Sequence, residues 1–206
     1  MSIVTLNNRA LRSATAVGST TSLGSLTFIK KLTASSSSTL SFVDGSSSVV
    51  LDNTYKEYLF TFKNIHIETN EAEFQFNMST DGGSNYDVTK TSSSFRAIHR
   101  EADTTALLQY YTSSDLAQST GFQPLGWDMS SDNDSSLSGY LHIFNPSSTT
   151  FVKHFIASVN FMHVDPRSDN YNYGGYGNTT SAIDAVQFKM SSGNIDAGDI
   201  CLYGIN

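Results

Sequence analysis

The sequence contains little cysteine, proline and charge. Its 206 residues include one cysteine, Cys201, and three prolines, and Lys, Arg, Asp and Glu together make up 15%. A single cysteine excludes an internal disulfide and a CxxC metal or redox site. No apolar run reaches the ~18 residues that a membrane-spanning helix needs, and the first residues lack the layout of a secretory signal. We therefore expect a chain that is made in a cytoplasm without a signal peptide and does not insert into membranes.

Serine, threonine and asparagine are abundant instead. The chain holds 33 Ser, 21 Thr and 15 Asn, a third of all residues, together with 24 aromatic residues. Turn-forming, β-branched and aromatic residues suit pleated, half-buried surfaces, whereas helices favour Ala, Leu, Glu, Lys and Arg. An apolar content of 38% is also enough to bury a core. The composition predicts an all-β protein and argues against a helix bundle, a coiled coil or a disordered chain.

Charge is distributed unevenly along the chain. Residues 1–43 contain four basic residues and no acid, whereas residues 44–206 carry 8 basic and 19 acidic residues. An acidic body repels phosphate backbones, so we expect no nucleic-acid partner for the main domain. The basic head either docks on an acidic partner or only keeps the chain end soluble.

Apolar and polar residues alternate with a period of two from residue 26 onward. Tyr58, Phe60 and Phe62 form one such set, and the same period returns at 74–78, 140–144 and 186–190. About eight to ten short strands at close spacing are typical of a sandwich or jelly roll. The sequence therefore predicts a single β-sandwich domain of jelly-roll type over residues 26–206.

Local features predict where the strands bend and end. The apolar set changes phase after Asn64, which indicates a β-bulge. Residues 81–85 form a predicted turn, and the Ser-rich stretch 34–39 is predicted to separate two strands. Residues 152–164 suit a central strand buried on both faces, and the apolar end 200–205 should be tied into a sheet.

Residues 1–25 read as a separate element. Leu6, Ala10, Leu11, Ala14 and Val17 have the spacing of a short apolar helical stripe, and a Ser- and Gly-rich linker follows. A helix this short needs something to bind. We expect residues 1–25 to be an anchor segment and linker.

Catalytic and metal-binding motifs are scarce. The sequence has no HExxH, GxSxG, P-loop or GxGxxG motif, so we expect no enzyme and no cofactor. Two weak metal hypotheses remain. The first is a metal site formed by histidines on strands, and the alternative is that these histidines only pack. The second is a loop whose hard oxygen ligands bind calcium, and the alternative is a solvated turn. The residues concerned are His142, His154 and His163 for the first, and Asp128, Asp132 and Asp134 for the second.

The segment 167–178 is predicted to be a long Tyr- and Asn-rich loop. Tyrosine rings stack on sugars and bring contact area at low entropy cost, and long loops are often functional. A glycan or host contact is one interpretation, and packing of the rings on the sandwich edge or on another subunit is the other. The candidate contact residues are Tyr171, Asn172, Tyr173, Tyr176 and Asn178.

Several motifs resemble a known family. The opening LNNRALRSATAVGS, the closing GYGNTTSAIDAVQFKMSSGNIDAGDICLYGI, and the internal FQFNMSTDGGSNYD, DLAQSTGF and FNPSSTTFVKHF are similar to small virion structural proteins of marine tailed phages, such as those infecting cyanobacteria. The resemblance covers most of the chain and includes no catalytic motif. It implies a β-sandwich that assembles on the phage particle as an appendage, fibre or decoration, with lysis as the route out of the cell.

The resemblance also implies roles for the two parts of the chain. The amino-terminal segment would hold the module to other virion proteins, with Leu6, Arg9, Leu11 and Arg12 as anchor contacts, and the β-sandwich would face outward. By analogy with tail-fibre modules we expect a homotrimer that serves host attachment. The alternatives are a capsid decoration protein that stabilises the shell, and an enzyme that degrades polysaccharides with a pair of carboxylates.

Overall fold

The computed structural model describes residues 26–206, which form twelve β-strands arranged in two antiparallel sheets. The predicted all-β sandwich is confirmed. Within these residues there is no helix. The strands are β1 Leu26–Ser37, β2 Thr39–Val43, β3 Glu57–Ile67, β4 Phe74–Ser79, β5 Lys90–Arg100, β6 Ala106–Tyr110, β7 Gln123–Gly126, β8 Leu137–Phe144, β9 Lys153–Met162, β10 Arg167–Gly177, β11 Ala185–Met190 and β12 Ile195–Ile205.

The strand order contains a jelly roll. The larger sheet has the order β1-β12-β3-β8-β9-β10-β5-β6, and the smaller has the order β2-β11-β4-β7. If β5, β6, β9 and β10 are set aside, eight strands remain, and their sheet orders in chain sequence are 1-8-3-6 and 2-7-4-5. These are the two four-stranded sheets of a jelly roll, which is built from two Greek keys.

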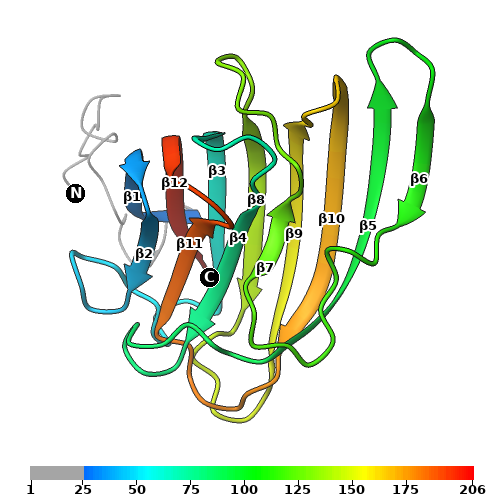
Figure 1. The fold of residues 1–206 in the computed structure, drawn as a ribbon. Helices are drawn as coiled ribbons and strands as arrows, with labels where there is room; N and C mark the ends of the chain where they lie inside the picture. Colours follow the sequence, from blue (N-terminus) through cyan, green and yellow to red (C-terminus); the bar gives the residue numbers. More distant parts are fainter. Residues whose placement is uncertain (1–25) are drawn as a thin grey trace, which may run out of the picture.

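The other four strands extend one sheet of the jelly roll. β9 pairs with β8 and continues through β10 and β5 to β6 at the edge. We call β9, β10, β5 and β6 the extension. Figure 1 shows the smaller sheet lying over one half of the larger sheet, while β5 and β6 reach beyond β7 on the other side. The extension therefore leaves part of the large sheet outside the sandwich proper.

The core between the sheets is rich in phenylalanine. Phe188 of β11 packs edge-on against Phe60 and Phe62 of β3, with ring centroids 5.4 and 5.3 Å apart. It also stacks on Phe74 of the neighbouring β4 at 5.8 Å. All four side chains are buried, and aromatic pairs of this geometry add about 0.5–1.5 kcal/mol each beyond the area they bury.

The period-two pattern predicted correctly which side chains of β3 are buried. Tyr58, Phe60 and Phe62 are buried, and the β3–β8 register shifts between Phe62 and Ile65. Asn64 adopts φ 50° at this shift, so the predicted bulge is confirmed. A turn joins β4 to the following segment at residues 81–85, and β12 lies between β1 and β3, as expected.

Two local predictions are wrong. The Ser-rich stretch 34–39 does not separate two strands along its length, because β1 continues through Ser37 and pairs with Ile195 of β12. Serine fits an exposed strand position as well as a turn, so composition misplaced this boundary. Residues 153–162 form β9, but the burial alternates and only one face is covered. The outward side chains include His154 and Ile156.

Candidate contact surface

The outward face of the large sheet carries most of the large exposed apolar side chains of residues 26–206. Seven of the eight large hydrophobic residues exposed in the described part of the chain lie there, and the eighth, Phe151, lies in the turn before β9. Three of these residues are aromatic and lie on β8, β5 and β6. Tyr140, Phe95 and Tyr110 are 41%, 48% and 54% exposed.

A cross-strand row connects these three aromatic residues. In the sheet register Tyr140 of β8 lies opposite Ser158 of β9, and Ser158 lies opposite Asn172 of β10. The row continues from Asn172 to Phe95 of β5 and from Phe95 to Tyr110 of β6. Neighbouring strands are ~4.8 Å apart, so the row spans roughly 19 Å. Aromatic rings thus stand at both ends of a polar centre.

Charged residues are absent from the outward positions of five neighbouring strands of the large sheet. The outward positions of β8, β9, β10, β5 and β6, which we call the neutral face, hold no Asp, Glu, Lys or Arg in the structure. The charged residues of β5, β9 and β10 all lie on the opposite side, toward the interior: Lys90, Arg96, Arg100, Lys153, Arg167 and Asp169. Charged side chains are almost never fully buried unless they are paired, so this arrangement is the reverse of the usual one.

The inward charges are held by local partners. The carboxylate of Asp169 is fully buried and accepts hydrogen bonds from Arg167, with Nε 2.7 Å from Oδ1. Arg96 lies 3.7 Å from the same carboxylate and donates a hydrogen bond of 2.7 Å to the hydroxyl of Tyr171. The Arg96 guanidinium also stacks on the ring of Tyr111, 3.8 Å from its centroid. This cluster ties β10 to β5 beneath the neutral face.

Asparagine side chains are fixed on the neutral face itself. Asn172 donates a hydrogen bond of 2.9 Å to Oδ1 of Asn170, and Asn170 donates one of 3.1 Å to the carbonyl of Val159. Asn160 donates to the hydroxyl of Ser168 at 2.9 Å. Amides that are already oriented lose little freedom when they bind a ligand.

The predicted contact loop is wrong, because residues 167–177 form strand β10 in the middle of the large sheet. Tyr171 and Tyr173 point inward and are 0% and 2% exposed. Burial raises the pKa of both hydroxyls, and Tyr173 donates to the carbonyl of Leu125. These two residues are core residues and cannot contact a ligand.

The other three predicted contact residues keep access to solvent. Asn172 and Tyr176 are half-buried on the outward side of β10, and Asn178 is exposed just after it. Asn178 donates a hydrogen bond of 2.9 Å to Gln118. The structure therefore brings Asn172 and Tyr176 onto the neutral face but separates them from Tyr171 and Tyr173. The anchor residues Leu6, Arg9, Leu11 and Arg12 lie outside the described residues.

The metal hypotheses gain no support from the geometry. Among residues 26–206 no group of three His, Cys, Asp or Glu side chains could hold a metal ion. Asp132 and Asp134 are exposed, and Asp128 lies 3.9 Å from His163. Burial and the nearby Arg167 lower the pKa of His163. His142 lies beside Glu57 at 3.0 Å, and His154 is exposed on the neutral face.

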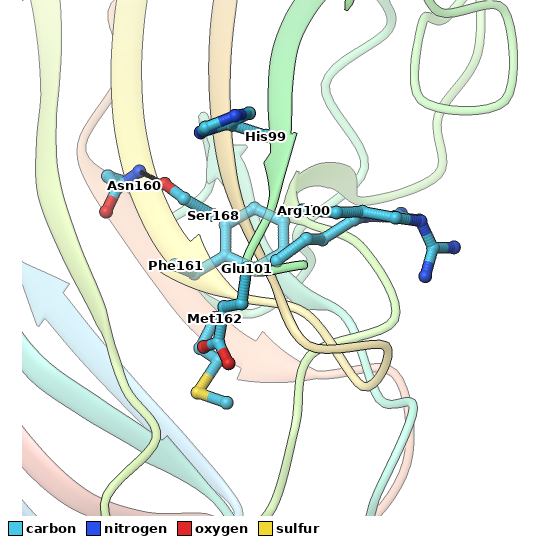
Figure 2. A pocket seen from close by; sticks show the side chains of 8 residues that line it. His99, Arg100, Glu101, Asn160, Phe161, Met162 and Ser168 are labelled. Carbon is cyan, nitrogen blue, oxygen red and sulfur yellow. Dashed lines mark hydrogen bonds between the residues drawn. The ribbon is translucent and has the colours of Figure 1, made fainter. Parts of the chain in front are cut away.

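A cavity of about 410 Å³ opens at one end of β9, β10 and β5. Figure 2 shows the side chains that line it, among them His99, Arg100, Phe161 and Met162. Two of its lining residues have partners of their own, since Arg100 pairs with Asp165 at 3.0 Å and His99 with Asp103 at 3.0 Å. A second cavity, of about 470 Å³, is lined mainly by polar residues that include His66, Asp134 and Asp196.

Fold and surface together define a jelly-roll β-sandwich whose larger sheet is extended by four strands and exposes an uncharged face. Comparison of the chain with protein-family models, curated proteins and solved structures finds no match. No helix in residues 26–206 is long and apolar enough to cross a membrane.

The neutral face was missed from the sequence, although a signal was present. In 167–177 the charged residues Arg167 and Asp169 share one phase of the strand with Tyr171 and Tyr173, while the other phase holds only uncharged residues. The glycines of this segment instead favoured the prediction of a loop. If the segment is interpreted as a strand, its alternation places the charged residues on the inward face and only uncharged residues on the outward face.

Proposed function

We propose that the protein is a non-enzymatic structural protein of a tailed-phage virion. Residues 1–25 attach it to other virion proteins, and the β-sandwich is displayed outward as a fibre or appendage module that contacts the host surface. The motif resemblance supports the virion assignment. The jelly roll agrees with it, because viral capsid and lectin domains use this architecture.

The neutral face is the observation that carries the contact role. Aromatic residues are enriched in contact surfaces, and charged residues are depleted from the centre of such surfaces. Here exposed aromatic side chains and ordered amides share one uncharged face of a chain whose net charge is −7. A purely internal structural role does not need that face to be free of charge.

Immunogold electron microscopy of purified virions tests the assignment. Particles of the encoding phage are purified on a density gradient, checked for the chain by mass spectrometry, and labelled with antibodies against residues 26–206. We expect the label on a tail or fibre. Label on the head would support the decoration alternative instead, and absence of the chain from the particles would refute a virion role.

A further inference from the structure

We infer that the neutral face binds an uncharged polysaccharide, with the sugar chain lying across the strands along the row from Tyr140 to Tyr110. This inference rests on the proposed function and names the partner of its contact surface. It places the contact on the flat outward side of β8, β9, β10, β5 and β6 and not on a loop.

The absence of charge selects the kind of partner. A polyanion would be met by Lys or Arg, and a basic protein surface by Asp or Glu, because complementary charges steer association and suppress wrong partners. β5, β9 and β10 turn their charged residues inward, as Lys90, Lys153 and Asp169 illustrate with 0% exposure, and β8 and β6 contain none. Carboxylates stand at the border of the face: that of Asp115 accepts a 2.6 Å hydrogen bond from the hydroxyl of Tyr110, and that of Glu57 lies 3.0 Å from His142.

The aromatic residues supply stacking platforms. A sugar ring presents C–H groups on its face, and these pack on an exposed aromatic ring, whose face is the negative part of its quadrupole. Phe95 and Tyr110 are direct neighbours across β5 and β6, and Tyr140 stands at the other end of the row. The bond to Asp115 holds the Tyr110 ring in place. Two platforms at one end and one at the other can hold an extended chain.

The polar residues at the centre of the row can form hydrogen bonds with sugar hydroxyls. Asn172 uses its Nδ2 group to bond Asn170, and within the described residues nothing donates to its Oδ1. An amide oxygen accepts from a hydroxyl, and the hydroxyl of Ser158 beside it both donates and accepts. The core of an interface with a second copy of the chain would be more apolar than this row of Ser and Asn, so a sugar fits the centre better.

A glycan array carrying neutral and acidic polysaccharides tests the inference with the full chain. We expect binding to one or more neutral polysaccharides and none to acidic ones. Phe95→Ala and Tyr140→Ala should each weaken that binding roughly tenfold or more, as expected for aromatic anchor residues. Phe151→Ala is the control, because Phe151 is also an exposed aromatic residue, at 68%, but lies off the neutral face. Binding by this variant should stay within about twofold of the parent.

Each other result overturns the inference. Binding to no neutral polysaccharide, binding to acidic ones only, or equal binding by all variants would contradict it. If Phe95→Ala and Tyr140→Ala instead lowered the solution mass, the face would join copies of the chain. Thermal midpoints close to that of the parent protein show that these exposed substitutions leave the fold intact. Virions that carry the chain while the array stays blank would refute this inference and leave the proposed function standing.

Discussion

At the scale of single residues, the buried charges of the extension are expected to have large effects on the free energy of unfolding. Asp169 is fully buried between Arg167 and Arg96, and removing one partner of such a pair leaves an unpaired buried charge. The sequence could not reveal this cluster, because Arg and Asp beside Tyr and Asn look like a polar loop. Only the register of β5 and β10 shows that these charges face inward.

Replacing Asp169 by Ala should lower the free energy of unfolding by about 3–5 kcal/mol. Asp165→Ala is the control, since that carboxylate pairs with Arg167 and Arg100 but is 52% exposed, and exposed pairs contribute about 0–1 kcal/mol. Urea denaturation of both variants measures the difference. Equal losses would show that the Asp169 cluster is not buried as described.

The burial of Lys90 should make the free energy of unfolding depend on pH. Its ammonium group donates to Oδ1 of Asn77 at 2.5 Å and to the carbonyl of Val88 at 2.8 Å, and burial lowers its pKa to about 7. An unfolded lysine titrates near pH 10.4. Between about pH 7 and pH 10 the unfolded chain therefore binds more protons at this residue than the folded chain, so stability rises with pH.

The Lys90→Met variant should lose most of that rise, which amounts to at most about 1.4 kcal/mol per pH unit. Lys153 contributes in the same direction, because burial lowers its pKa as well, so a smaller rise remains. The exposed Lys56→Met variant keeps the parent profile. Denaturation curves at pH 7, 8 and 9 measure the slopes, and parallel slopes for all three proteins would contradict the buried state of Lys90.

At the scale of elements, β10 is a strand that its own sequence does not predict. Strand segments with alternating sequences, such as β4 and the first half of β3, could be predicted from their aromatic residues alone. The Gly- and Asn-rich β10 could not, since these residues are depleted in strands. Its glycines have a packing reason. A Cβ on Gly175 would lie 2.6 Å from the ring of Phe155 and 2.7 Å from the carbonyl of Thr91.

Gly175→Ala should therefore destabilise the sandwich by about 1–3 kcal/mol, as overpacking does. Gly174→Ala is the matched control, because its Cβ meets only the hydroxyl of Ser93, at 3.9 Å, on the outward side. We expect that variant to stay within about 0.5 kcal/mol of the parent. Thermal unfolding of the two variants separates the outcomes, and similar midpoints would show that β10 does not pack as described.

At the scale of the whole molecule, composition and periodicity were sufficient for the fold class but not for the extension. The jelly-roll strands follow the expected alternation, whereas β5 joins the large sheet by pairing with β10, and β6 by pairing with β5. No local sequence pattern encodes these pairings. The neutral face exists only because β8, β9, β10, β5 and β6 align their outward positions. A surface assembled from distant segments in this way depends on register, which one sequence does not supply.

The assembly expected for a fibre module can be measured directly. Light scattering after size exclusion should give a trimer both for the full chain and for a chain that starts at Leu26, where β1 begins. A trimer lost on truncation would make residues 1–25 the oligomerising element. Monomers from both would contradict a self-assembling appendage and favour a decoration subunit.

Competition for adsorption tests the central claim, that the neutral face is the host-contacting surface, most directly. Purified full chain is added to host cells before the phage, and the fraction of adsorbed phage is counted. We predict that the parent chain and a Ser46→Asp control block adsorption. Ser158→Asp, which places a carboxylate in the middle of the row, should not block it. Equal blocking by Ser158→Asp, or no blocking by any of the three proteins, would contradict the account.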